Sequence, residues 1–155
     1  MSDRKPPPLA ADDRDTLTAL LRYQRESLVR KVTGVDEEAA RTRFVRSGTT
    51  LLWLVKHITW AEVVWLRHRF AGEDGVVPDD AVTPADTLAD AIQTYRATWA
   101  SSDAVIAASD LDAIARRAEA TVNLRWIVAH LLEETARHAG HADIIRELLD
   151  GETGR

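Results

Sequence analysis

Two segments of the sequence carry side chains of the kind that hold metal ions. Glu134 and His138 lie in the stretch EETARHAGHADIIRE (133–147), and His57 lies in the stretch LLWLVKHITW (51–60). Residues four apart in a helix stand one above the other on adjacent turns, so Glu134 and His138 can reach one ion. Two imidazoles and a carboxylate suit a divalent cation and leave a position open for water or substrate, which is typical of a catalytic metal site.

The apolar residues around these side chains predict that they face the interior of the protein. On a helical projection, Glu134, His138 and His141 interrupt a stripe that is otherwise apolar. The other members of the stripe are Ile127, Leu131, Ile145 and Leu148. His57 continues a similar stripe on the earlier helix. Burying an unpaired carboxylate is costly, and a cation between the two helices compensates for it. We therefore predict a metal site formed by His57, Glu134 and His138.

The same pattern leaves alternatives open. A satisfied core histidine and an exposed Glu–His pair would explain it without any metal. His141 competes for the place of the third ligand, and His141 and His130 are candidates for a general base that accepts a proton. Trp53 and Trp60 lie one turn from His57, where they belong to the core or wall a substrate pocket. Zinc is the first expectation for the metal, and nickel, cobalt, manganese and iron are the alternatives.

The elements that must position these side chains read as four amphipathic helices. We predict them at about 13–32, 49–71, 84–108 and from Thr121 or Asn123 to about 149. The connection after the first helix is expected to begin with one turn of helix. The connection before the last helix is expected to have some local helical character. No segment shows a convincing strand pattern, so the predicted fold class is all-α, a four-helix bundle.

Length and composition are those of one globular domain. We predict a flexible, proline-rich segment at 1–11 and a single domain at 12–155. The 155 residues include no cysteine, so disulfides, thiolate ligands and a cysteine nucleophile are excluded. A formal net charge of −5 argues against a nucleic-acid partner. No apolar run is long enough to cross a bilayer and the N-terminus has no signal-peptide pattern, so a cytoplasmic location is expected.

Two quoted stretches resemble a known family. SGTTLLWLVKHITWAEVVWL, followed by WIVAHLLEETARHAGHADIIRELLDG, is similar to the DinB-like superfamily of four-helix metalloproteins, and most similar to its actinobacterial domains of unknown function. Many members use three histidines, whereas this chain has Glu134 where the middle histidine would fall. In this the chain resembles the N-terminal domain of mycothiol-dependent maleylpyruvate isomerase, whose metal is held by two histidines and one glutamate. Carried over by position, the resemblance implies His57, Glu134 and His138 as ligands.

The resemblance also implies a function. Characterised relatives are isomerases or S-transferases that use mycothiol, bacillithiol or glutathione, and they are often homodimers. We therefore expect a metal-dependent S-transferase that joins a low-molecular-weight thiol, first of all mycothiol, to small electrophiles. A metal-dependent hydrolase on the same site is one alternative. A non-catalytic metal-binding or stress-response protein is the other.

Overall fold

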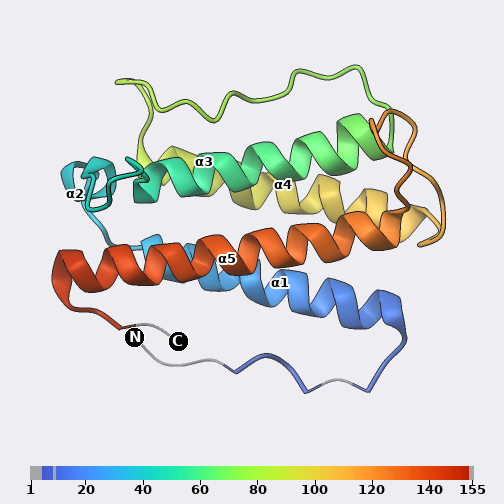
Figure 1. Ribbon diagram of the computed structural model, residues 1–155, viewed down its shortest axis with the longest axis horizontal. Coiled ribbons are helices and arrows are strands. Elements are labelled where there is room, and N and C mark those ends of the chain that lie inside the picture. Colours follow the sequence, from blue (N-terminus) through green and yellow to red (C-terminus); the bar gives the residue numbers. More distant parts are fainter. Residues whose placement is uncertain (1–4, 9, 154–155) are drawn as a thin grey trace.

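Long helices make up most of the chain, and the computed structural model describes residues 5–8 and 10–153 (Figure 1). The helices are α1 (Asp13–Val32), α2 (Glu37–Arg41), α3 (Leu51–Glu62), a π-helical continuation η1 (Val63–Phe70), α4 (Leu88–Ala108) and α5 (Leu124–Asp150). Within these described ranges no strand forms, and one isolated bridge pairs Ile114 with Asn123. The predicted all-α fold class is therefore confirmed. The predicted flexible segment at 1–11 falls partly outside the described residues.

Each long α-helix begins at a residue whose side chain caps the first turn. Asp12, Thr50, Thr87 and Asn123 each accept a hydrogen bond from the backbone N–H three residues later. Such caps satisfy backbone donors that the helix itself leaves free. Gly151 follows α5 with a φ of 74°, the left-handed conformation that commonly ends a helix. The two helices that carry the predicted ligands thus have defined starting points.

The structure differs from the sequence-based expectations in three places. The third predicted helix starts at Leu88 rather than at 84, because the Asp86 carboxylate accepts a hydrogen bond from the Thr83 N–H and closes a turn there. Residues 109–123 form turns, not the expected local helix. Their backbone is tied to the start of α5, where Arg125 N–H donates to the Leu111 carbonyl. The second predicted helix has the expected extent, but its last part is a π-helix.

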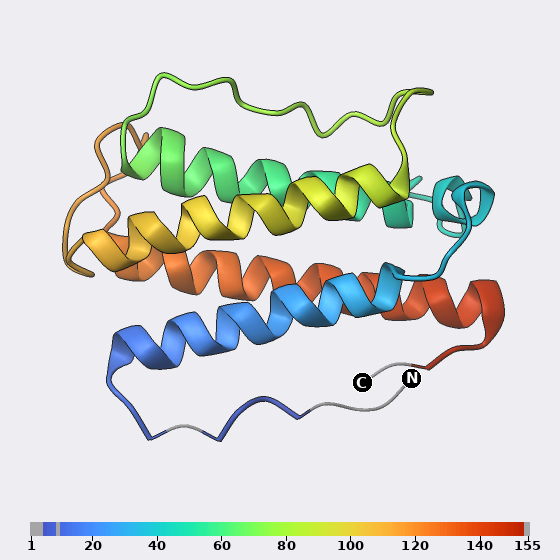
Figure 2. The same cartoon turned by 180° about the vertical axis from the view of Figure 1, so that it is seen from behind.

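The helices pack as a four-membered bundle in which neighbours along the chain are not all antiparallel. α1 and α5 lie side by side and run in the same direction. α3 and α4 also lie side by side and run parallel to each other, in the direction opposite to that of α1 and α5 (Figures 1 and 2). α3 and α5 are therefore antiparallel neighbours. Because α3 and α4 are parallel, the segment 71–87 returns along the outside of the bundle (Figure 1). Among the described residues, no helix combines the length and apolar character needed to cross a membrane.

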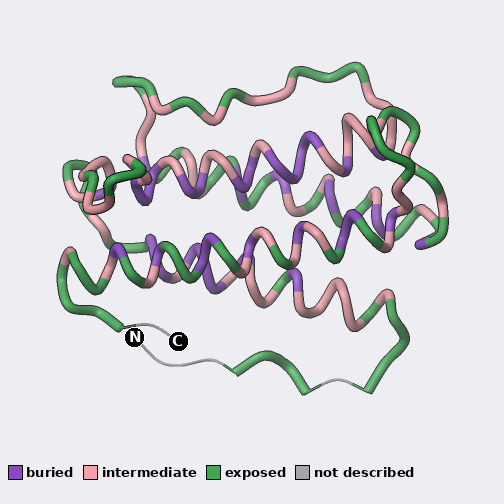
Figure 3. The backbone as a smooth tube through the Cα atoms, viewed as in Figure 1, coloured by how far each residue is buried: buried purple, intermediate pink, exposed green. Residues whose placement is uncertain are grey.

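Apolar side chains fill the space between the helices, and buried residues follow the inner sides of the tube in Figure 3. On α3 these include Leu54, Ile58 and Ala61, and on α5 they include Leu131 and Ala142. These residues fix the rotation of both helices about their axes. The side of each helix that carries the predicted metal ligands consequently faces the contact between α3 and α5.

The ion pair of Arg25 and Glu62 is buried in the core. Arg25 on α1 is 1% exposed and Glu62, the last residue of α3, is 0% exposed. The Arg25 guanidinium donates through Nε and Nη2 to both carboxylate oxygens of Glu62, at 2.7 and 2.8 Å, and through Nη1 to Asp103 at 2.7 Å. Burial alone would lower the pKa of Arg25, but Glu62 and Asp103 raise it above its usual value. The guanidinium therefore stays charged inside the bundle.

We expect Glu62→Ala to lower the free energy of unfolding by about 3 kcal/mol, because it leaves most of a buried positive charge uncompensated. Glu26→Ala is the matched control. It removes an exposed ion pair with Arg22 and should change the free energy of unfolding by less than about 0.5 kcal/mol. Urea unfolding monitored by circular dichroism measures both. Equal effects of the two substitutions would contradict the structural role of the buried pair.

Candidate metal centre

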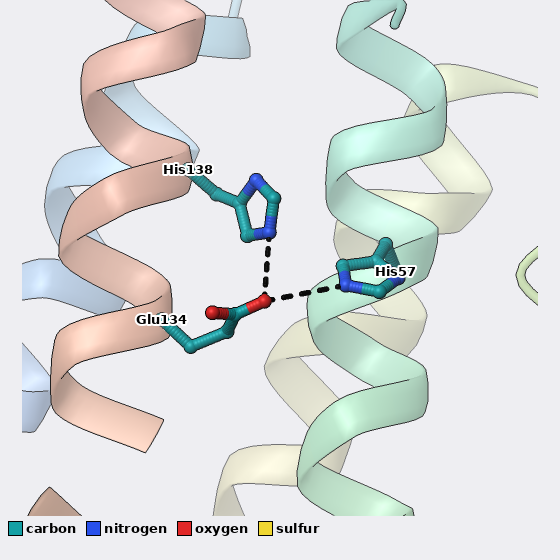
Figure 4. Close-up of side chains that lie close together, drawn as sticks. All are labelled: His57, Glu134 and His138. Atoms are coloured by element: carbon teal, nitrogen blue, oxygen red, sulfur yellow. Dashed lines mark hydrogen bonds and ion pairs between the residues drawn. The ribbon is translucent and has the colours of Figure 1, made fainter. Parts of the chain in front are cut away.

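The three predicted ligands meet between α3 and α5 (Figure 4). Glu134 Oε1 lies 3.0 Å from His138 Nε2 and 3.5 Å from His57 Nε2. One ligand atom from each residue lies within 4.8 Å of the others. A zinc ion binds nitrogen and oxygen ligands at about 2.0–2.2 Å, so such atoms end up roughly 3.5 Å apart around it. The donor set and its spacing therefore fit a divalent cation with little rearrangement.

Both histidines have a partner on the ring nitrogen that faces away from Glu134. His57 Nδ1 lies 2.8 Å from Asp80 Oδ2, and His138 Nδ1 lies 3.3 Å from His141 Nδ1. A carboxylate on Nδ1 keeps the proton there and leaves the Nε2 lone pair free for a metal. The contact with His141 can hold His138 in the same tautomer. Both Nε2 atoms are thus the donors directed at the shared point.

Asp80 is a site residue that the sequence reasoning missed. It lies in the segment 71–87, which has no helical periodicity to show which side chains point inward. The structure ties this segment to α3 at two adjacent residues. Lys56 contacts the Ala81 carbonyl and lies 2.8 Å from Asp86 Oδ2, and His57 holds Asp80. The only available sequence signal was the aspartate-rich composition, which is also typical of an ordinary loop.

Aromatic rings enclose the His57 imidazole. Trp53 stacks on it at a centroid distance of 4.6 Å and an angle of 18°, and Trp60 stacks on it at 5.5 Å and 24°. Trp53 also meets His138 edge-on at 6.0 Å. The two tryptophans, for which the sequence left a place in the core or in a pocket wall open, therefore lie at the site. Their rings restrict the rotation of His57 and shield it from water.

The structure places the two candidate bases differently. His141 contacts His138 and is exposed. It lines a cavity of about 240 Å³ whose other lining residues are Val45, Ser47, Thr49, Ile144 and Ile145. His130 lies one turn before Glu134 on α5 and stacks on Trp126 rather than joining the ligand group. Of the two, only His141 adjoins a predicted ligand in these contacts.

The charges at the site suit metal binding at neutral pH. Burial lowers the pKa of His138, although the nearby Glu134 opposes this effect. Burial alone would raise the pKa of Glu134, but hydrogen bonds with His138 and His57 and the charge of Arg137 bring it below its usual value. Glu134 is therefore a carboxylate and His138 a neutral imidazole. These are the protonation states that a metal requires.

Substitution of Asp80 should weaken metal binding without removing a ligand. We expect Asp80→Asn to lower the affinity for zinc by about 10–100-fold, because the amide no longer fixes His57 by a charged hydrogen bond. Asp79→Asn is the matched control, since Asp79 contacts the Ala81 N–H and not His57. Competition with a chromophoric chelator measures both affinities. Equal zinc affinities of the two variants would show that Asp80 does not support the site.

The titration of His138 gives a second prediction. In metal-free protein, NMR should show His138 titrating below the ordinary histidine pKa of about 6.5, and lower still in Glu134→Gln, because the opposing carboxylate charge is lost. The folded protein then binds fewer protons than the unfolded chain as the pH falls through about 6.5, so its stability decreases there. A His138 midpoint above 6.5, or an upward shift in Glu134→Gln, would contradict this account of the site.

Comparison with known proteins assigns the chain to a family. Among curated proteins no sequence match was found. The family model described as Mycothiol-S-transferase matches residues 16–151, which span α1 to the glycine that follows α5. This match covers most of the chain, including all three predicted ligands, and agrees with the DinB-like resemblance of the two motif stretches. The protein belongs to the mycothiol S-transferase family.

Proposed function

We propose that the protein is a divalent-metal-dependent S-transferase that joins mycothiol to small electrophiles. The observation that carries this proposal is the convergence of His57, Glu134 and His138 on one point, in a chain of the mycothiol S-transferase family. The chain contains no cysteine, so the reacting sulfur has to come from a cosubstrate. Zinc is the proposed metal because two imidazole nitrogens and one carboxylate oxygen are typical zinc ligands.

In the proposed reaction the thiol sulfur forms a bond to an electrophilic carbon. If that carbon bears a leaving group, the group departs with the bonding electrons. If it belongs to an activated alkene, the electrons move to the neighbouring carbon, which then takes up a proton. A divalent ion at the site, when bound, lowers the pKa of a nearby thiol and so favours the nucleophilic thiolate.

The residues of the chain would contribute orientation, charge and proton transfer. Asp80 and His141 orient the two imidazoles, and Trp53 and Trp60 keep water from the ring of His57. The negative charge of Glu134 reduces the net charge of the occupied site. The thiol proton leaves to solvent or to a base, for which His141 and His130 stay the candidates.

Metal analysis and a thiol screen on one preparation test the proposal. Wild-type protein should carry about one metal ion per chain and should conjugate electrophiles only when mycothiol is present. Glu134→Gln should lose most of the metal and at least a hundredfold in kcat/KM, since it removes a charged ligand. Glu147→Gln is the matched control, because Glu147 is an exposed glutamate near the C-terminal end of α5 and is not a predicted ligand.

Three outcomes would overturn the proposal. Turnover of substrates without any thiol would indicate a metal-dependent hydrolase. Wild-type protein that binds no metal would indicate a non-catalytic bundle. Equal metal content in Glu134→Gln and Glu147→Gln would show that the ligand set is wrong.

A further inference from the structure

A second group of rings lies beyond the metal centre, and we call it the aromatic platform. It consists of Trp65 from η1 and of Trp126 and His130 from α5. Trp126 and His130 stack at 5.0 Å and 18°, and Trp65 lies 5.3 Å from Trp126 and 5.0 Å from His130. The guanidinium of Arg69 lies 4.2 Å from the centre of the Trp65 ring.

The aromatic platform is continuous with the metal centre along both helices. On α5, His130 precedes Glu134 by one turn. On the other helix, Trp60 stacks on His57, and Trp65 follows Trp60 by five residues. Trp65 is the third residue of η1, and its ring contacts His130 of α5.

The aromatic platform is accessible to a ligand. Trp126 is 46% exposed, and Trp65 and His130 are partly exposed. Aromatic rings that gather at the surface next to a functional site are typical of ligand-binding surfaces. Its neighbours are charged, since His130 Nδ1 lies 3.8 Å from Glu133 Oε2 and Arg69 covers Trp65. Flat apolar faces bordered by charged groups fit a sugar ring, which presents C–H groups on its face and hydroxyls at its edge.

We propose that the aromatic platform binds the glucosamine–inositol part of mycothiol while the sulfur of its cysteinyl group lies at the metal centre. This inference rests on the function proposed above. At 1.5 Å per residue, His130 lies about 6 Å and Trp126 about 12 Å along α5 from Glu134. Five covalent bonds separate the sulfur from the first sugar ring, a reach of about 6 Å. The inositol ring is attached beyond the glucosamine ring, so it would lie at the same distance along α5 from Glu134 as Trp126.

The cavity on the other side of the site is a poorer match for the sugars. It lies next to His141, and the side chains of Val45, Ile144 and Ile145 make its lining largely apolar. Its size of about 240 Å³ suits one small apolar group rather than two hydroxylated rings. The two ends of the site therefore differ in chemistry, and the charged, ring-lined end is the one assigned to the thiol.

Kinetics with two thiols test the assignment. Trp126→Ala should raise KM for mycothiol at least tenfold with little change in kcat, and it should leave KM for N-acetylcysteine, which has no sugar, unchanged. Trp126→Phe keeps a flat ring and should restore most of the affinity for mycothiol. Leu148→Ala is the matched control, because Leu148 is an exposed apolar residue near the far end of α5. Its KM for mycothiol should stay at the wild-type value, and metal content should be equal in all variants.

Binding without catalysis provides an independent readout. Thiol-free glucosaminyl-inositol, added to wild-type protein, should shift the indole N–H signals of Trp65 and Trp126 in NMR spectra, and Trp126→Ala should abolish the shift at Trp65. Unmoved indole signals would overturn the inference. So would an equal rise of KM for mycothiol and N-acetylcysteine, or a rise of KM for the electrophile alone. If wild-type protein shows no thiol-dependent turnover, the proposed function fails, and this NMR experiment still decides whether the platform binds the sugar.

Discussion

The carboxylate of Glu134 lies in the contact between two antiparallel helices, and it is the constraint around which the site is organised. One of its oxygens faces Nε2 of both His57 and His138. Glu134 is partly buried, and the groups that face it from both helices stabilise its charge. Apolar residues such as Ile58 and Leu131 set the rotation of α3 and α5 about their axes. The packing of the core therefore positions the carboxylate and the two imidazoles next to one another.

The direction of the helices explains how a loop takes part in the site. Because α3 and α4 run in the same direction, their connection has to travel the length of the bundle, and it passes α3 (Figure 1). Lys56 and His57 bind that connection from adjacent positions on α3. An ordinary up-and-down bundle has short connections at its ends and would not bring Asp80 to the middle of a helix.

Helical periodicity was sufficient to predict the fold class. It also predicted that three residues far apart in the sequence lie close together in space. Glu134 and His138 interrupt an apolar stripe, and the stripe fixes which way they point. The same reasoning could not find Asp80, because its position depends on a tertiary contact of an irregular segment. It also could not find η1, since apolar residues continue through Val63 and Val64 without any break in the pattern. The helix start predicted at residue 84 is overridden by the turn between Thr83 and Asp86.

The connection 71–87 is longer than the distance it has to cover. The twelve residues of α3 and the eight of η1 span roughly 30 Å, while a chain of this length can extend to over 50 Å. Because of this excess length, the connection can accept insertions, deletions and substitutions that leave the packing of the helices unchanged. Related proteins can therefore diversify this flank of the reaction site during evolution at little cost in stability, provided that they keep an anchor for the histidine beneath it.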